Sequence, residues 1–380
     1  MYRDGSITEL VVPDGERSDT DGSSSSATAT FHTERRSEWW QSAAVITGEI
    51  MGTGVLSLPY ACSRLGWALG LSSALGFGAT AVYSGLLLST CRNHLYPDAT
   101  SFADLAGATG GRRFATFTRV AIAVGWACIL PYYLVAAASA LEAAFPGTGL
   151  CYWQWSLILM LIMAPILQIR SLHGLSLLSL MSTFAILVVL CVLIPALVAS
   201  RAATVVTSVG LPPNHGDFLK VYGSFGSFIF AYQGQSMFLE ILREMKRPSE
   251  FPYALLVANG IMVAAYIGIC IVGYGFHGEG VAGFLPDTLP EGAPRSVVGL
   301  LLCYHTMVSY LLTGQPLYRC VHLALFPATA DATGCKAALQ WAGITLSFLI
   351  FAFVVANAVP FFADFQVPNG RGLRGRGLRG

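Results

Sequence analysis

Nine apolar segments, each about 17–27 residues long, occupy most of the chain between residues 41 and 362. A helix needs about 20 mostly apolar residues to cross the hydrocarbon core of a bilayer. Because backbone groups in lipid must satisfy their hydrogen bonds internally, each segment predicts a membrane-spanning helix. The predicted spans are 41–63, 67–90, 117–143, 153–169, 175–199, 221–242, 253–276, 296–318 and 337–362.

The composition agrees with this interpretation. Hydrophobic residues make up 54% of the chain and charged residues only 11%, whereas a soluble domain carries about 25% charged residues. We therefore expect an all-α polytopic membrane protein that works as a monomer and whose main partner is the lipid bilayer. A net charge of +1 gives no reason to expect nucleic-acid binding.

Motifs of common enzymes are missing from the sequence. It contains no GxxxxGK[ST] phosphate loop, no HExxH and no GxSxG. These motifs mark ATP-driven, metalloprotease and serine-hydrolase chemistry respectively. We therefore expect neither an enzyme nor an ATP-driven pump, and no bound cofactor.

Three regions differ in composition. Residues 1–36 are rich in Ser, Thr, Asp and Gly and have too little apolar surface to fold, which predicts a disordered tail. Residues 37–364 form the predicted transmembrane domain. Residues 365–380 repeat Gly, Leu and Arg, and we interpret them as a low-complexity, non-native tail from a truncated or frame-shifted gene model or a splice variant. A basic functional tail is the alternative.

Basic residues favour one orientation in the membrane. Cytoplasmic loops carry an excess of Lys and Arg. With the N-terminus in the cytoplasm, twelve basic residues fall on the inner side and four on the outer side. The inner group is Arg35, Arg36, Arg92, Arg112, Arg113, Arg119, Arg170, Arg243, Lys246, Arg247, Arg319 and Lys336, and the outer group is Arg64, Arg201, Lys220 and Arg295.

Two of the apolar segments carry residues that break helices. The first contains Gly52-Thr53-Gly54 followed by Pro59, and the sixth contains the polar run 232–235, Tyr-Gln-Gly-Gln. Glycine lets a backbone unwind cheaply, and paired discontinuous helices are typical of transporter binding sites. The helix N-terminus beyond a gap favours a carboxylate, and freed carbonyls favour an ammonium group. An amino acid carries both groups.

Several windows resemble one family. WQSAAVITGEIMGTGVLSLPYACSRLGW resembles the first membrane segment of the amino acid/auxin permease family, with its GxGxLxLPxA core and a following Leu-Gly-Trp. FIFAYQGQSMFLEILREMKRPSEFPYAL resembles the sixth segment, SFADLAGATGG the loop between the second and third spans, and FVVANAVPFF the ninth segment. The resemblance extends in order from about residue 40 to residue 364.

This resemblance implies a fold and a mechanism. The family is similar to transporters of the amino acid–polyamine–organocation superfamily, which share the bacterial leucine transporter fold. That fold has two inverted five-helix repeats, binds substrate at broken helices 1 and 6, and works by alternating access. Family members usually have eleven spans, so a chain with nine is expected to be incomplete at its C-terminal end.

The resemblance also places substrate-binding residues. Backbone amides of the first break would bind the carboxylate, and carbonyls and the amide side chain of the sixth segment would face the amino group or the substrate side chain. One tyrosine of the third span would cap the substrate. The implied substrate-binding residues are Gly52, Thr53, Gly54, Ala231, Tyr232, Gln233, Gly234 and Tyr132.

Each of these assignments has a structural alternative. Gly48 and Gly52 form a small-xxx-small pattern typical of helix packing. Tyr232 is equally compatible with an ordinary packing role. Tyr132 follows Pro131 in the third span, which is also typical of a kinked core helix with satisfied hydroxyls.

Titratable residues within the spans suggest the coupling ion. A carboxylate such as Glu49 inside a span is costly and usually faces a cavity or a partner, so we expect it to take part in proton coupling. His305 in the eighth span is the second candidate. The alternative for both is a hydrogen-bonded structural residue. Some sodium-coupled relatives carry Asn where this chain has Gly48-Glu49, which favours protons, although Ser309 and Thr313 could ligate sodium; no other metal is expected.

Glu240 and Arg243 lie three residues apart near the inner end of the sixth span, where an i,i+3 ion pair is expected at a gate. The leading hypothesis is a proton-coupled secondary active symporter of neutral amino acids in the plasma membrane or a vacuolar or endosomal membrane. The alternatives are a sodium-coupled transporter, an amino-acid-sensing receptor that signals through residues 1–36, and a non-functional fragment. A membrane-embedded enzyme using His305 or His173 lacks a supporting cluster of polar residues.

Overall fold

The computed structural model describes residues 37–99, 101–169, 172–211, 218–330, 332 and 334–358. The predictions for residues 1–36 and 365–380 lie outside this part of the chain. Within it, every regular element is helical except for one isolated bridge between Ser37 and Met245. The predicted all-α fold class is therefore confirmed for the described residues.

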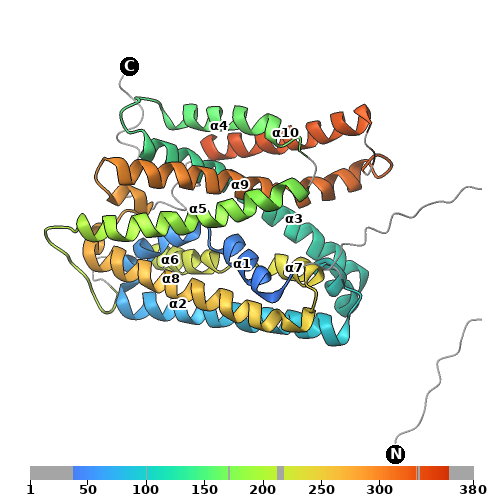
Figure 1. The fold of residues 1–380 in the computed structure, drawn as a ribbon, viewed down its shortest axis with the longest axis horizontal. Helices are drawn as coiled ribbons and strands as arrows, with labels where there is room; N and C mark the ends of the chain where they lie inside the picture. The colour runs from blue at the N-terminus through green and yellow to red at the C-terminus, as the bar shows by residue number, and fades with distance from the viewer. Residues whose placement is uncertain are drawn as a thin grey trace, which may run out of the picture. The chain divides into compact units, whose positions relative to one another are not determined.

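The helices follow the apolar segments. Ten α-helices are described, with short 3₁₀ or π turns between some of them (Figure 1). The α-helices are α1 (Trp39–Ile50), α2 (Leu58–Thr90), α3 (Phe102–Ala144), α4 (Tyr152–Ile166), α5 (Leu172–Ala199), α6 (Phe218–Ala231), α7 (Phe238–Glu244), α8 (Phe251–His277), α9 (Ala293–Leu325) and α10 (Cys335–Ala358). The turns are η1 (Thr53–Ser57), the π-helical η2 (Cys91–Leu95), η3 (Gln235–Met237), η4 (Pro248–Glu250), η5 (Gly278–Gly280) and η6 (Leu285–Thr288).

Six helical stretches in the described residues are long and apolar enough to cross a membrane. They are Thr53–Leu95, Phe102–Ala144, Met181–Ala199, Pro248–Gly280, Ala293–Leu325 and Cys335–Ala358. α4 is apolar but has only 15 residues. The first and sixth predicted spans are divided into short helices, since α1 has 12 residues and α6 has 14. At about 1.5 Å of rise per residue neither half spans a bilayer alone.

Packing brings helices that are distant in sequence side by side. α2 lies against α8, and α3 and α5 lie against α9. α4 and α10 pack together and against α3 (Figure 1). The short helices α1, α6 and α7 all contact the α2–α8 pair or its neighbours. Gly54 and Ala231, at the two interruptions, are buried, although α6 also carries exposed side chains such as Tyr222.

A connecting segment joins one end of α2 to one end of α8. The amide nitrogens of Trp67 and Ala68 donate to the carbonyls of Ser208 and Val209 at 3.0 and 2.9 Å. The backbone of α2 bends at Gly66, where φ is +76° and an added Cβ would lie 2.0 Å from the Gly210 carbonyl oxygen. Only glycine fits this bend, because other residues are disfavoured at positive φ.

The same segment reaches α8. The amide of Ser208 donates to the Tyr274 hydroxyl oxygen at 2.8 Å, and the amide of Glu279 donates to the Val206 carbonyl at 3.1 Å. Residues 206–210 therefore connect α2, just after its bend at Gly66, to the end of α8 through hydrogen bonds of their own main chain.

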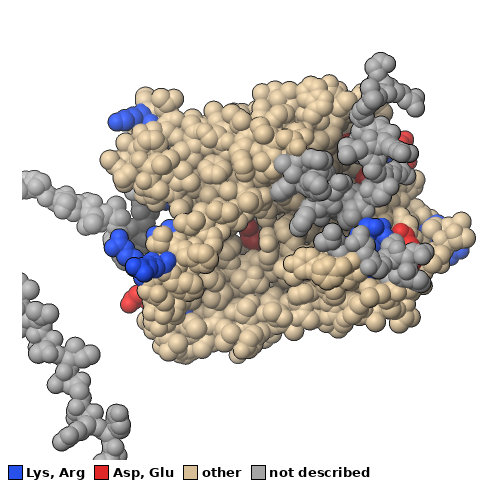
Figure 2. Space-filling model, turned by 180° about the vertical axis from the view of Figure 1, so that it is seen from behind, with Lys and Arg blue, Asp and Glu red and all other residues tan. Residues whose placement is uncertain are grey.

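The surface suits a lipid environment. Exposed Leu, Ile, Val and Phe side chains are spread along most of the long helices, with Leu161 and Phe184 62% and 68% exposed. Figure 2 shows a broad surface across the middle of one face that is uncharged apart from one recessed acidic group, with Lys and Arg mostly toward its two ends. Apolar surface on this scale marks contact with lipid or with other protein, which agrees with an integral membrane protein.

The start of the described chain is attached to the end of α7. The amide of Ser37 donates to the Glu244 carbonyl at 3.1 Å, and the amide of Lys246 donates to the Ser37 carbonyl at 2.9 Å. Lys246 also forms an ion pair with Glu38, with Nζ and Oε1 2.7 Å apart. The beginning of the first interrupted segment and the end of the second are thus held together.

Candidate functional site

The two helix interruptions lie against each other. α1 ends at Ile50, and regular α-helix resumes only at Leu58. α6 ends at Ala231, and helical structure resumes with η3 at Gln235. A Cβ added at Gly54 would lie 3.2 Å from the Ala231 Cα, and one added at Gly234 would lie 2.4 Å from the Ile50 Cγ1. The predicted glycines therefore occur where the two interrupted segments cross.

Tyr132 of α3 reaches the first interruption. Its hydroxyl forms a hydrogen bond with the Thr53 hydroxyl, and both side chains are buried. Its ring meets the Phe230 ring edge-on, with centroids 4.9 Å apart. Three of the elements predicted to form the substrate site are thus brought together by one tyrosine. Pro131 also lies within α3. Tyr132 is therefore compatible both with a packing role in a proline-containing helix and with a place at the substrate site.

Tyr232 occupies a different position. The side chain is buried, and its ring packs edge-on against the Tyr266 ring with centroids 4.9 Å apart. Its hydroxyl lies 3.2 Å from the place that a Cβ would occupy at Gly78 of α2. Within the described part of the chain that hydroxyl has no hydrogen-bond partner. These contacts favour the packing interpretation of Tyr232.

Two side chains, one from α8 and one from η3, form hydrogen bonds with the backbone of the second interruption. The Tyr266 hydroxyl donates to the Ala231 carbonyl at 2.8 Å. The Gln235 side chain accepts from the Gly234 amide at 3.1 Å and donates to the Tyr232 carbonyl at 3.2 Å. Gln233, by contrast, is exposed. Tyr266 was missed by the sequence analysis because it lies in an uninterrupted apolar span, where a tyrosine carries no local signal of its role.

Glu49 lies at the end of α1 and is half-buried. Its charge acts on the Tyr133 hydroxyl of α3, to which Thr313 of α9 donates at 3.5 Å. A Cβ added at the preceding Gly48 would lie 2.0 Å from the Thr183 Oγ1, so α5 passes directly beside this point. The end of α1 that carries Glu49 therefore lies near α3 and α5, and Tyr133 links α3 to α9 there.

His305 of α9 lies beside the first interruption. Its side chain is 2% exposed, and its Nε2 lies 3.4 Å from the place of a Cβ on Gly52. On its other side, Nδ1 lies 2.8 Å from the Ser182 Oγ of α5. Which of the two nitrogens carries the proton depends on the tautomer. The second titratable candidate thus links α9, α5 and the unwound turn, whereas its partner Ser182 had no sequence signal.

The remaining predicted residues are placed as follows. The Ser309 hydroxyl donates to the His305 carbonyl at 3.0 Å, so it lies one helical turn along α9 from the histidine. The described residues contain no group of three or more His, Cys, Asp or Glu side chains able to hold a metal ion. Glu240 and Arg243 lie together on α7, beyond the second interruption, and Arg243 acts on the Glu240 carboxyl electrostatically.

Comparison with known proteins gives a consistent result. The family described as transmembrane amino acid transporter protein matches residues 35–366. Amino acid transporter AVT1B of Arabidopsis thaliana is 28% identical over 330 residues, which cover 84% of this chain and 59% of that protein. A transmembrane transporter of Gibberella moniliformis is 27% identical, covering 95% of this chain and 78% of that protein.

The vesicular inhibitory amino acid transporter of Homo sapiens is 27% identical over 365 residues, covering 89% of this chain and 67% of that protein. The chain spans about three fifths of the length of the AVT1 relatives that it matches.

Proposed function

The chain belongs to the transmembrane amino acid transporter protein family, and we propose that it is a secondary active transporter of neutral amino acids coupled to protons. The family is one of transporters and not of enzymes. One observation carries the proposal: two interrupted helices cross at Gly54 and Ala231, inside the helical assembly, with Tyr132 bonded to the interruption.

The substrate site is proposed at this crossing, where regular helix is interrupted in both segments. The turn 51–57 presents amides at the start of η1 and α2, where the helix dipole favours a carboxylate. The carbonyls of the second interruption at 232–234 would accept from an ammonium group through a second lone pair, since the Tyr232 and Gly234 carbonyls already accept one hydrogen bond each. Because glycines lie at both interruptions, the two backbones approach each other closely, with no side chain of Gly54 or Gly234 between them. We assign carboxylate binding to Gly52, Thr53 and Gly54.

Proton coupling is proposed on two buried or half-buried groups beside the same turn. Glu49 precedes the interruption by one helical turn, and His305 lies against Gly52. Both are titratable groups within spans, where such groups usually serve ion or proton pathways. His305 contacts Ser182 of α5, and the charge of Glu49 acts on Tyr133 of α3. Sodium bound near Ser309 and Thr313 is the competing assignment.

The fold proposed for the whole transporter is the inverted-repeat arrangement with broken helices 1 and 6. In support, the α1–η1–α2 and α6–η3–α7 breaks begin the first and second sets of helices in chain order. The N-terminus is proposed to be cytoplasmic, from the excess of basic residues on that side. The membrane is proposed to be the plasma membrane or a vacuolar or endosomal membrane.

Uptake into vesicles tests the function. Purified full chain would be reconstituted and offered a labelled mixture of neutral amino acids at about pH 5.5 and about pH 7.5, which bracket the titration of histidine. We expect acid outside to stimulate uptake. Glu49→Gln should remove the acid stimulation, and the matched change Glu291→Gln, at an exposed loop position, should leave it unchanged.

Other outcomes decide against parts of the proposal. Uptake that needs sodium and ignores pH would overturn the proton assignment and support the hydroxyls of α9 as ion ligands. Amino acid binding without uptake would favour the receptor hypothesis. Uptake by Thr53→Val and Tyr132→Phe at the level of the unchanged chain would refute the placement of the substrate site.

A further inference from the structure

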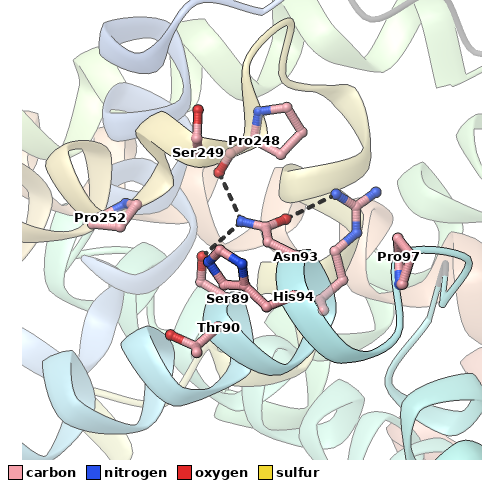
Figure 3. A pocket seen from close by; sticks show the side chains of 9 residues that line it. Ser89, Thr90, Asn93, His94, Pro97, Pro248, Ser249 and Pro252 are labelled. Atoms are coloured by element: carbon pink, nitrogen blue, oxygen red, sulfur yellow. Dashed lines mark hydrogen bonds between the residues drawn. The ribbon is translucent and has the colours of Figure 1, made fainter.

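A cavity of about 450 Å³ lies away from the candidate substrate site, where α2 ends against η4 and the start of α8. Figure 3 shows its side chains converging from these elements. Apart from three prolines, every lining side chain is basic or a hydrogen-bonding group. These are Ser89, Thr90, Arg92, Asn93, His94 and Ser249.

A local widening of the helix builds this cavity. The last turn of α2 becomes the π-helical η2, closed by a hydrogen bond from the Tyr96 amide to the Cys91 carbonyl at 2.9 Å. π-helical turns are rare and occur frequently at functional sites. The five residues of η2 include Arg92, Asn93 and His94, which line one side of the cavity.

Asn93 fixes the geometry. Its Nδ2 donates to the Ser89 Oγ at 3.2 Å and to the Pro248 carbonyl at 3.1 Å, and its Oδ1 accepts from the Arg92 Nη1 at 3.1 Å (Figure 3). One amide therefore ties α2 to η4 and orients a guanidinium group. The Arg92 residue is only 6% exposed, so this orientation is held by the protein and not by solvent.

The charges around the cavity favour an anion. The described residues that line it include no Asp or Glu. Of the neighbouring acids, Glu250 is paired with Arg247 at 3.0 Å, and Asp98, next to the lining residue Pro97, is exposed. A guanidinium with nearby hydroxyls and an imidazole matches a phosphate group, which accepts several hydrogen bonds and binds Arg in a bidentate manner.

The position in the chain indicates where the phosphate comes from. Arg92 belongs to the basic set that the sequence places on the cytoplasmic side, together with Lys246 and Arg247. Anionic headgroups concentrate at the cytoplasmic leaflet, and basic pockets between membrane helices on this side bind phosphorylated headgroups. A volume of about 450 Å³ lies within the range of small-molecule sites.

We propose that the α2–η4 cavity binds the phosphate of an anionic phospholipid headgroup, with Arg92 and His94 as its cationic ligands and the hydroxyls of Ser89, Thr90 and Ser249 as further donors. Because this site is separate from the interrupted helices, the proposal does not depend on the transported substrate. Its consequence is that a lipid of the inner leaflet holds the ends of α2 and α8 together.

The experiment measures lipid binding by the full chain. Detergent-purified protein would be titrated with a soluble short-chain phosphatidylinositol phosphate, with phosphatidylcholine of the same chain length, and with inorganic phosphate. We expect saturable binding of the phosphorylated lipid alone. Arg92→Gln should weaken it by about tenfold or more, the usual effect of losing a charge-assisted hydrogen bond.

Two further variants separate binding in the cavity from general attraction between charges. Ser249→Trp places a large side chain at an exposed position of the lining without removing charge, and it should also abolish binding. Lys246→Gln removes one positive charge from the same end of the molecule but does not line the cavity, and it should bind normally. Equal melting temperatures of the variants would show that each is folded.

Three outcomes are informative. Loss of lipid binding in Arg92→Gln and Ser249→Trp, but not in Lys246→Gln, supports the headgroup site. Inorganic phosphate that competes at the concentration of the lipid would support the phosphate site and assign it to a soluble phosphate. Unchanged binding by Arg92→Gln, or equal weakening by Lys246→Gln, would overturn the proposal, because binding would then reflect general charge.

Discussion

Gly299 lies at a close approach of α9 to α3. A Cβ added to it would lie 2.5 Å from the Ala140 carbonyl oxygen, 2.9 Å from the Ala144 Cβ and 3.0 Å from the Ala144 amide nitrogen. Two of these three atoms belong to the backbone and cannot rotate away. Gly299→Ala must therefore push the two helices apart, by about 0.9 Å to restore ordinary contact with the nearest atom.

Two opposing effects set the size of the change. A glycine replaced by alanine in a helix interior gains about 0.5–1 kcal/mol from reduced backbone freedom. Overpacking of a well-packed interior costs about 1–3 kcal/mol. We expect a net destabilisation of about 1–2 kcal/mol. Uptake should also fall, since α3 carries Tyr132 and α9 carries His305.

The assay is the apparent melting temperature of purified protein in detergent, followed by intrinsic fluorescence. The control is Gly125→Ala in α3, where the residue is exposed and nothing lies within 4 Å of an added Cβ. This control should melt at the same temperature as the unchanged chain or higher. If Gly299→Ala melts no lower than Gly125→Ala, the close approach of α3 and α9 is wrong.

Two further changes test other contacts. Tyr266→Phe should lower the apparent melting temperature, because the Ala231 carbonyl loses its donor at a cost of about 1–3 kcal/mol; Tyr83→Phe, at a 65% exposed position, should not. Hydrogen bonding to Lys246 and its charge lower the pKa of Glu38 below 4.5, so this stabilisation is complete above that value and is lost as the pH falls through the lowered pKa. Glu38→Gln should therefore leave the ratio of uptake at about pH 5.5 to uptake at about pH 7.5 unchanged.

Local sequence signals were enough to locate the interruptions. Gly52, Gly54 and Pro59 predict an unwound turn because of their backbone preferences, and α1 indeed ends at Ile50 before them. The start of α3 also had a local signal, since Ser101 and Asp104 form a capping box. The apolar pattern nevertheless predicts this span only from residue 117, fifteen residues after α3 begins, because the first residues of the helix are not apolar enough to mark a membrane span.

Tertiary partners could not be predicted in the same way. His305 and Ser182 are 123 positions apart, and Tyr266 lies 35 positions from the carbonyl that it satisfies. Such contacts depend on how whole helices pack, and no spacing within a single span encodes them. The π-helical end of α2 had no sequence signal either, because one additional residue in a turn does not change the apolar pattern.

The segment 206–210 has a mechanical consequence. It is hydrogen-bonded to the backbone of α2 beside Gly66 and to the backbone just beyond α8, so the two helices share a fixed pivot at that end. Hydrogen bonds at one end of two packed helices restrict their movement there more than at the other end. If α2 and α8 move during transport, their backbone displacement should be largest where α2 meets η4 and smallest beside Gly66.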